Sequence, residues 1–235
     1  MIMLKSCIFH YCIIIFAFSN LVQGFSTKAP SSSSTKKTFH FGGGCFWAPA
    51  DNLRNVPGVL STKVGYCGDD TPFVKLPTYD KVCNGRTNLV EAVRVEYDEN
   101  QLSYADMLSL FADVNTAQWE NKRQYRGIIF TNSNEEKKIA QEFLKQNQDV
   151  VAELEPMSNT FYTAETYHQN YWAKWRVRIP SFVGLLALIG NFGGDTIGVD
   201  LSDKLYNGIA VGFILFTMLE RRVFTDQAVI VGKTK

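Results

Sequence analysis

The chain has 235 residues, of which 46% are hydrophobic, and a formal net charge of +1. This length and composition are sufficient for one ordinary domain with extensions, or for two small domains, with a real hydrophobic core. Because the net charge is close to zero, nothing indicates a nucleic-acid partner.

Residues 1–24 have the pattern of a signal peptide. A short basic start is followed by an apolar stretch, Cys7 to Phe18, and then by small or polar residues up to Gly24. The apolar stretch is too short for a comfortable membrane span. Residues 25–37 form a linker rich in Ser, Thr and Lys, and no Asp or Glu precedes Asp51.

This combination resembles the bipartite presequence of algae whose plastids lie inside extra membranes. We therefore expect import into a chloroplast, with the secretory pathway as the alternative. Either route predicts removal of Cys7 and Cys12, which leaves Cys45, Cys67 and Cys83 in the mature protein.

Predicted strands and helices alternate along the mature chain. A short strand at 38–41 leads through three glycines to Cys45, and Pro49 suits the first turn of a helix that continues to Leu53. Further strands are expected at 59–66, 90–97, 127–131 and 150–154, a loop at 68–80, and helices from Ser103, from Ser133 and over 164–175. This order predicts an α+β fold, a two-layer sandwich.

Residues 179–235 are expected to form a C-terminal extension. Its apolar segments, 182–189 and 209–218, are each too short to cross a bilayer as a helix, so we expect no membrane span in the mature chain. We expect them to cover the core or a partner surface. Four glycines between residues 190 and 198 predict a loop between the two segments.

The run Gly42-Gly43-Gly44-Cys45-Phe46-Trp47 is the most distinctive pattern in the chain. A thiol at the N-terminus of a helix has a lowered pKa, which favours the reactive thiolate. The two aromatic residues after Cys45 would form an apolar wall for a small hydrophobic group. The alternative is a buried structural cysteine.

The strand around Glu91 suggests a general acid. With a period of two, Glu91 shares a face with Val93, Val95 and Tyr97, which is the apolar face. Partial desolvation there would raise the pKa of the carboxyl into a range useful for proton donation. The alternative is that Glu91 bends out to water at the start of the strand.

Seven phrases spread in order over residues 38 to about 175 resemble one family, the peptide methionine sulfoxide reductases of the A type. They are Gly44-Cys45-Phe46-Trp47, Pro57-Gly58-Val59 with Val64-Gly65-Tyr66, Pro77-Thr78-Tyr79, Val82-Cys83-Asn84-Gly85-Arg86-Thr87, Glu91-Ala92-Val93, Gln124-Tyr125-Arg126 and Tyr167-His168-Gln169. We place the corresponding domain at 38–178.

The resemblance implies thiol-dependent reduction of the S epimer of methionine sulfoxide in proteins or peptides, without metal or organic cofactor. It also implies a ferredoxin-like plait core with a mixed sheet. The substrates would be oxidised proteins or peptides, and the reductant thioredoxin or another thiol.

The resemblance also implies roles for single residues. Cys45 would attack the sulfoxide and become a sulfenic acid, while Glu91 donates a proton to the oxygen. Tyr79 and Tyr125 match the tyrosines that hold the oxygen, and Phe46 with Trp47 would enclose the S-methyl group. From the residues alone, Tyr79 could equally be a loop anchor and Tyr125 a half-buried strand residue.

Other positions match the family less closely. Glu120 is the only carboxylate near the position of the family's site Asp, and an exposed loop carboxylate is its alternative role. His168 and Tyr171, spaced one helical turn apart, match positions that line or support the pocket. With three histidines and no Cys-x-x-Cys pair, a metal site is poorly supported.

Regeneration of the sulfenic acid departs from the family pattern, because no cysteine follows Cys83. The resolving thiol would be Cys67, in a Gly-bracketed position that we expect to be mobile, or Cys83, or it would come from outside as thioredoxin or glutathione. Of the two cysteines we favour Cys67, since Cys83 matches a family cysteine that is not usually catalytic and reads as a buried structural thiol.

Two other functions stay open at this point. A hydrolase could use Cys45 with His168 on esters or peptides. A catalytically weakened relative could bind oxidised methionine without reducing it.

Overall fold

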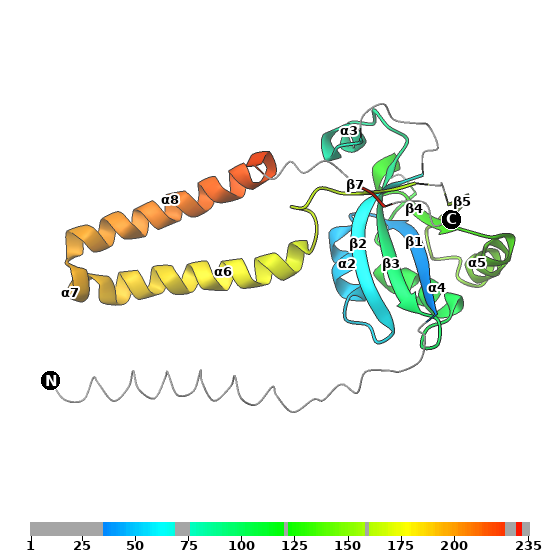
Figure 1. Cartoon of the computed structure of the whole chain (residues 1–235), viewed down its shortest axis with the longest axis horizontal. Coiled ribbons are helices and arrows are strands. Elements are labelled where there is room, and N and C mark those ends of the chain that lie inside the picture. The colour runs from blue at the N-terminus through cyan, green and yellow to red at the C-terminus, as the bar shows by residue number, and fades with distance from the viewer. Residues whose placement is uncertain (1–34, 69–75, 120–121, 158–159, 224–228, 232–235) are drawn as a thin grey trace. The chain divides into compact units, whose positions relative to one another are not determined.

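The structure is a computed structural model that describes residues 35–68, 76–119, 122–157, 160–223 and 229–231 (Figure 1). The predicted signal peptide, most of the linker after it and Glu120 lie outside the described residues.

The described chain is built on a mixed seven-stranded sheet with strand order β5-β4-β1-β3-β2-β6-β7. The β4–β5 pair is parallel and every other pair in this order is antiparallel. The strands are β1 (Lys36–Gly43), β2 (Val59–Cys67), β3 (Val90–Asp98), β4 (Gly127–Thr131), β5 (Glu153–Pro156), β6 (Phe161–Thr163) and β7 (Val229–Val231).

Helices connect these strands. They are α2 (Trp47–Leu53), α3 (Tyr79–Cys83), α4 (Tyr104–Val114), the 3₁₀ turn η1 (Arg123–Tyr125) and α5 (Asn134–Gln146), followed by α6 (Tyr171–Leu188), the π-helical turn η2 (Ile189–Gly193), α7 (Gly194–Ile197) and α8 (Val199–Val223). Among them, α2, α4 and α5 pack on one face of the sheet. Ser103 caps α4: its hydroxyl accepts from the Asp106 N–H at 3.1 Å, and the Asp106 carboxylate accepts from the Ser103 N–H at 2.7 Å. Strand and helix segments therefore form the expected α+β fold.

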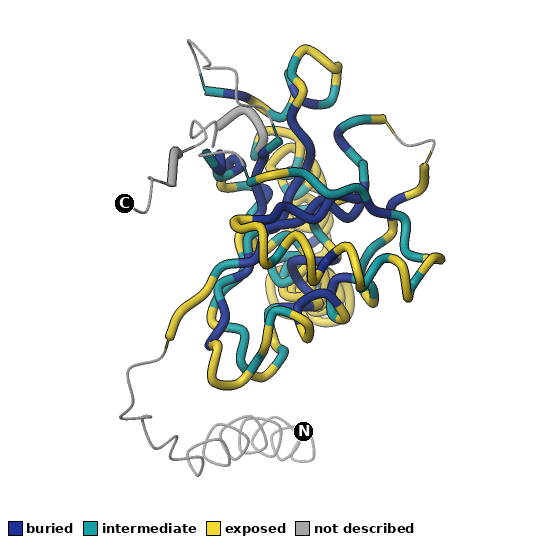
Figure 2. Tube along the Cα trace, turned by 90° about the vertical axis from the view of Figure 1, so that its right-hand side faces the viewer, coloured by how far each residue is buried: buried dark blue, intermediate teal, exposed yellow. Residues whose placement is uncertain are grey.

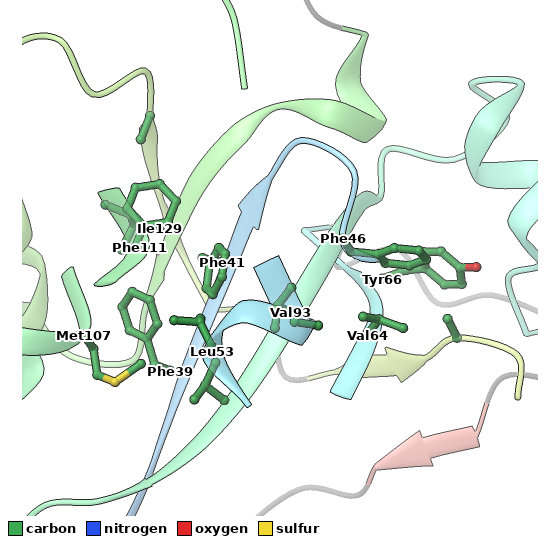
Figure 3. Packing of buried hydrophobic residues seen from close by; sticks show 14 of the residues in the cluster. Phe39, Phe41, Phe46, Leu53, Val64, Tyr66, Val93, Met107, Phe111 and Ile129 are labelled. Carbon is green, nitrogen blue, oxygen red and sulfur yellow. The ribbon is translucent and has the colours of Figure 1, made fainter. Parts of the chain in front are cut away.

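The main hydrophobic core lies between the sheet and helices α2 and α4 (Figure 3). Alternate residues of β1 point into it, so Phe39 and Phe41 pack against Met107 and Phe111 of α4. Phe111 is fully buried and meets Phe41 edge to face, with ring centroids 5.3 Å apart.

The opposite face of the sheet carries a second buried cluster, and buried residues dominate the central strands (Figure 2). Its members are Cys67, Val90, Ala92, Ile128, Phe130 and Phe161. Both faces of the sheet are therefore covered, although the sequence pattern indicated one apolar face for β3.

The last predicted helix begins later than expected. The sequence pattern indicated a helix over 164–175, but residues 164–170, which follow β6, form an irregular segment and a turn, and α6 starts at Tyr171. Asn170 has a left-handed backbone with φ of 55°, which ends the turn and separates His168 from the helix. His168 and Tyr171 thus lie on different elements.

The C-terminal extension corrects two expectations. Residues 182–189 and 209–218 are parts of much longer helices, α6 and α8, which run antiparallel (Figure 1). Most of the expected glycine loop is helical, because η2 and α7 continue α6 and the chain turns at Gly198, with φ of 86°. Within the described residues, one continuous helix, Tyr171–Ile197, is long and apolar enough to cross a membrane, judged by length and composition alone.

Replacing Phe111 by Ala should destabilise the domain by about 3–5 kcal/mol, because it opens a cavity in the core beside Phe41. Urea unfolding of the full chain would show a lower midpoint with an unchanged slope. Ile139→Ala on α5, where the side chain is 39% exposed, is the matched control and should change the midpoint little. Equal effects of the two changes would contradict this description of the core.

Candidate active site

Cys45 lies in the turn between β1 and α2. Gly44 before it has φ of 84°, and a Cβ atom there would lie 2.5 Å from the Thr116 hydroxyl oxygen, so the turn requires glycine. Helix α2 begins at Trp47 with Phe46 as its N-cap, which leaves Cys45 exposed just before the helix. The turn therefore presents the thiol to solvent.

The expectation of a lowered pKa for Cys45 is wrong. Partial desolvation raises the pKa of the thiol, and the nearby Glu91 and Cys83 raise it further. The N–H of Trp47 hydrogen-bonds to the sulfur and opposes this shift without cancelling it. In this structure the thiol, not the thiolate, is the stable form at neutral pH.

Glu91 lies on the apolar face of β3, as the period of two predicts, and is 1% exposed. Its Oε2 accepts from the N–H of Phe46 at 3.3 Å, which joins the carboxyl to the residue after Cys45. Burial raises the pKa of Glu91 from 4.5 to about 7, although hydrogen bonds from Phe46 and Gln124 favour the charged form. The carboxyl can therefore hold a proton near neutral pH and give it up readily.

Gln124 connects two functional groups and was not assigned a role from the sequence. Its side chain is buried, and its Nε2 donates to Glu91 Oε1 at 3.4 Å and to Cys83 Sγ at 3.3 Å. The residue stands in the phrase Gln124-Tyr125-Arg126 that carried the resemblance, which was the available signal.

The two tyrosines meet beside the carboxyl. The hydroxyl of Tyr79 hydrogen-bonds to Tyr125 and to Cys83. Burial, followed by the hydrogen bond to Cys83 and the charge of Glu91, raises the pKa of Tyr79 far above its usual range. Burial and Glu91 also raise the pKa of Tyr125. Both hydroxyls therefore stay protonated and can donate hydrogen bonds.

An aromatic cluster adjoins Cys45. The Trp47 indole N–H donates to Nδ1 of the fully buried His168 at 3.1 Å. The ring of Tyr171 stacks on the ring of Trp47, with centroids 3.9 Å apart and an interplanar angle of 4°. Phe46, 1% exposed, packs on His168. Its ring also lies beside that of Tyr66 (Figure 3). His168 and Tyr171 thus hold Trp47 in place.

Glu165 is a second group that sequence reasoning missed. This buried carboxylate accepts from the Tyr79 N–H at 2.8 Å and from the Tyr66 hydroxyl at 2.7 Å. It fixes the start of α3, and with it Tyr79, to the central sheet. Its place two residues before the phrase Tyr167-His168-Gln169, which carried the resemblance, was the only signal.

The structure reverses the expected ranking of Cys67 and Cys83. Cys67 was expected at a mobile position, but it is fully buried in β2 and belongs to the cluster on the opposite face from Phe46 and Tyr66. Cys83 ends α3 on the side of the carboxyl and is only partly buried. Burial raises the pKa of both thiols. Of the two, Cys83 is the one in the site.

Among the described residues, no group of three His, Cys, Asp or Glu side chains could hold a metal ion. Glu120 lies outside the described residues, so its expected role in the site stays a prediction.

Residues 37–183 match the family model of peptide methionine sulfoxide reductase. The chain belongs to this family. It is an oxidoreductase, a peptide methionine sulfoxide reductase, and its relatives carry that name. The enzyme MsrA of Nautilia profundicola is 40% identical over 144 residues, which cover 57% of this chain and 81% of the relative. That of Methanoculleus marisnigri is 38% identical over 159 residues, or 62% of this chain and 93% of the relative.

Solved structures agree with this assignment. Methionine sulfoxide reductase A of Corynebacterium diphtheriae superposes with a TM-score of 0.51 at 26% identity, over 61% of this chain and 76% of that one. Mxr1 of Saccharomyces cerevisiae in reduced form gives the same TM-score and identity over 64% and 91%. The family match thus covers strands β1 to β6 and the helices between them, while β7 and most of the C-terminal hairpin lie beyond residue 183.

Replacing Glu91 by Gln in the reductase should make the protein more stable at pH 8 and change its stability less at pH 5. Folding raises the pKa of Glu91 from 4.5 to about 7, so the folded state binds the proton more tightly. This contribution is present in full below pH 4.5 and is lost as the pH rises through 7, where a charge must be buried. Thermal unfolding at the two pH values measures the difference.

Glu96→Gln is the matched control on the same strand, because Glu96 pairs with Lys36 at 2.7 Å. It should lower stability at pH 8. A loss of stability at pH 8 in Glu91→Gln as well would show that the Glu91 carboxylate is not strained by burial.

Proposed function

We propose that this enzyme reduces the S epimer of methionine sulfoxide in proteins or peptides, with Cys45 as nucleophile and Glu91 as general acid. The observation that carries the proposal is the buried Glu91, whose pKa is about 7 and whose carboxylate accepts from the N–H of the residue next to Cys45. A carboxyl with this pKa is suited to donate a proton at neutral pH.

The first half of the reaction transfers oxygen from the substrate to Cys45. The Cys45 thiolate attacks the sulfoxide sulfur and forms a transient bond between the two sulfurs, while Glu91 gives its proton to the sulfoxide oxygen. The S–O bond of the substrate then breaks, the hydroxyl oxygen bonds to the Cys45 sulfur, and the bond between the two sulfurs breaks as its electron pair returns to the substrate sulfur. The products are methionine and a sulfenic acid on Cys45. The protonated hydroxyls of Tyr79 and Tyr125 are suited to hold the oxygen as charge develops on it.

Cys45 and Glu91 share one proton in the reactive state. Each negative charge raises the pKa of the other group, so the pair at neutral pH carries a thiol with a carboxylate or a thiolate with a carboxyl. Only the second form reacts. Both forms have the same net charge, so their ratio does not depend on pH.

Phe46 and Trp47 are proposed to enclose the S-methyl group of the substrate. The ring of Phe46 is held by Tyr66 and His168, and the ring of Trp47 by His168 and Tyr171. A rigid apolar wall on one side and hydroxyl donors on the other distinguish the two ends of the sulfoxide. This asymmetry supports selection of one epimer.

Regeneration is proposed to use Cys83. Its thiol attacks the sulfur of the Cys45 sulfenic acid, which forms a Cys45–Cys83 disulfide and releases water. Cys83 lies close enough to influence the pKa of Cys45, and its sulfur accepts from Gln124, which also binds Glu91. Thioredoxin or another dithiol would then reduce the disulfide, while direct reduction of Cys45 is the alternative.

Two further assignments are proposals. The order β1-α2-β2-β3-α4-β4 with strands arranged β4-β1-β3-β2, all antiparallel, supports a ferredoxin-like plait as the core. The signal-like and Ser/Thr/Lys-rich pattern of residues 1–37 supports import into a chloroplast, or secretion as the alternative. Family membership disfavours the Cys–His hydrolase, and turnover of a methionine sulfoxide peptide would exclude a mere binder.

The dependence of kcat/KM on pH should show a break near pH 7. Below it both groups are protonated, so the rate falls by about tenfold per pH unit, and above it the rate is flat until Cys45 ionises. In Glu91→Gln the rate should fall by roughly 10²–10⁴-fold, and the rate should rise with pH through the neutral range without a break. A break near pH 7 that persists in this variant would contradict the role of Glu91.

Cys83→Ser should block recycling after one turnover. Mixed with one equivalent of a methionine S-sulfoxide peptide, the variant should form one equivalent of methionine and retain a sulfenic acid on Cys45, detected by trapping with dimedone and intact mass. The unmodified chain should lose two hydrogens as a disulfide forms. Cys67→Ser is the control and should behave like the unmodified chain. If Cys67→Ser fails to form the disulfide and Cys83→Ser still forms it, the resolving cysteine is Cys67 and not Cys83.

A further inference from the structure

The C-terminal hairpin, defined as α6 to α8 (residues 171–223), has no explanation in the reductase chemistry. Helix α6 buries none of its residues, whereas α4 fully buries Met107, Leu108 and Phe111. In α8, Ser202 is the only buried residue among those with described side chains. An ordinary helix of a soluble domain buries an apolar stripe. The hairpin therefore presents almost all of its apolar surface outward.

Exposed apolar side chains surround both legs of the hairpin. At 100° per residue, Val177, Leu188 and Leu185 of α6 lie on one side of the axis, and Ile179 and Val183 lie on the other. The exposed apolar residues of α8 likewise cover the full circle: Val199, Leu201, Leu205, Tyr206, Val211, Ile214, Leu215, Phe216, Met218 and Leu219. A helix that is apolar all round is surrounded by an apolar medium, since a single protein partner would need only one stripe.

Charges are confined to the two ends of the hairpin. Residues 179–194 and 205–219, which are 16 and 15 residues long, contain no Asp, Glu, Lys, Arg or His. As helices they span roughly 24 and 22 Å, which is close to a hydrocarbon core of about 30 Å once the flanking long side chains reach the interface. The length and the distribution of charge match a bilayer.

The two ends of the hairpin differ in charge and in aromatic content. The end near the sheet carries Lys174, Arg176, Arg178, Arg221 and Arg222 in its sequence, with one acid, Glu220. The turn end carries three Asp, at 195, 200 and 203, and one Lys. Trp172 and Trp175 stand at the basic end, where interfacial tryptophans are common. The basic end thus complements the anionic head groups of lipids.

Several polar side chains of the legs have partners inside the hairpin. Arg178 pairs with Glu220 through two hydrogen bonds of 2.8 and 2.9 Å, which neutralise both at the basic end. Thr217 and Asn191 donate to backbone carbonyls of their own helices, at Ile214 and Ala187. This arrangement is required where no water is present.

The legs contact each other through small and aromatic residues. A Cβ on Gly193 would lie 2.3 Å from the Ser202 hydroxyl, and Phe182 stacks on Phe213 with centroids 4.0 Å apart. Such close contacts through glycine and serine are typical of helices in lipid, where burial of apolar surface does not drive association. Pro180 within α6 is also tolerated there.

We propose that the hairpin is inserted into a lipid bilayer, with both legs crossing the hydrocarbon core. The basic end and the reductase domain lie on one side, and the acidic turn around Gly198 emerges on the other. The excess of basic residues places the domain on the side from which the chain is inserted. This inference adds a membrane-bound state to the reductase and does not depend on the proposed catalytic residues.

Protection of the turn tests the crossing. The full chain is synthesised in the presence of sealed vesicles of phosphatidylcholine and phosphatidylglycerol, and Thr196→Cys is labelled with a membrane-impermeant maleimide. Labelling in sealed vesicles should be at least about tenfold slower than after detergent opens them. Asn134→Cys, exposed at the start of α5, is the control and should react equally in both states. Equal labelling of Thr196→Cys in both states would overturn the proposal.

Flotation of the same vesicles through a density gradient after a carbonate wash tests which segment anchors the chain. The double variant Leu185→Arg, Ile214→Arg places one charge in the middle of each leg. The fraction of this variant recovered with the floated vesicles should be at least about tenfold lower than that of the unmodified chain. Ile139→Arg on α5 is the matched control and should float normally. Reduction of a methionine sulfoxide peptide by each sample verifies that the domain is folded.

Two results would contradict insertion. Undiminished flotation of the double variant would assign membrane binding to another segment, because residues 1–24 are the same in every sample. A chain that stays in solution as a dimer, and becomes a monomer in the double variant, would show that a second copy covers the hairpin.

Discussion

The site depends on one contact, the hydrogen bond from the Phe46 N–H to the buried carboxylate of Glu91. It joins the turn after β1 to the start of β3, two strands that pair side by side, and so fixes the nucleophile relative to the acid. The cost is a carboxyl buried on an apolar face, which raises its pKa to about 7. Stability is thereby exchanged for a proton donor, as is common at functional sites.

Around this contact the site is built as two supporting layers. In the first layer, Gln124 donates hydrogen bonds to Glu91 and to Cys83. Glu165 accepts a hydrogen bond from the backbone N–H of Tyr79. His168 and Tyr171 hold Trp47. These residues act by positioning, which explains how an exposed cysteine in a turn can still have a defined geometry.

Much of the sheet was predictable because local signals were strong. The strand at 127–131 is β4 to the residue, and Ser103 and Ser133 cap the helices that their sequence pattern indicated. The period of two also placed Glu91 correctly.

The position of Cys67 was predicted wrongly because a Gly-bracketed residue suggests mobility, whereas the second buried cluster on the far side of the sheet arises from residues distant in sequence. Gln124 and Glu165 escaped notice since a positioning role depends on tertiary neighbours that no local pattern records. The helices of the hairpin are longer than expected because each apolar run was measured alone, although the helical turn η2 continues through the glycines.

The stack of Tyr171 on Trp47 connects the C-terminal hairpin to the active site. Tyr171 is the first residue of α6, and Trp47 forms one wall beside the nucleophile, so the two rings link the hairpin to the pocket without a hinge between them. The same tryptophan and Trp175 border a cavity of about 700 Å³ that Leu215 and Met218 of α8 also line. Under the proposed insertion into a bilayer, a change in the tilt of the legs would displace that stack and alter the cavity. The catalytic rate would then depend on the thickness of the bilayer around the hairpin.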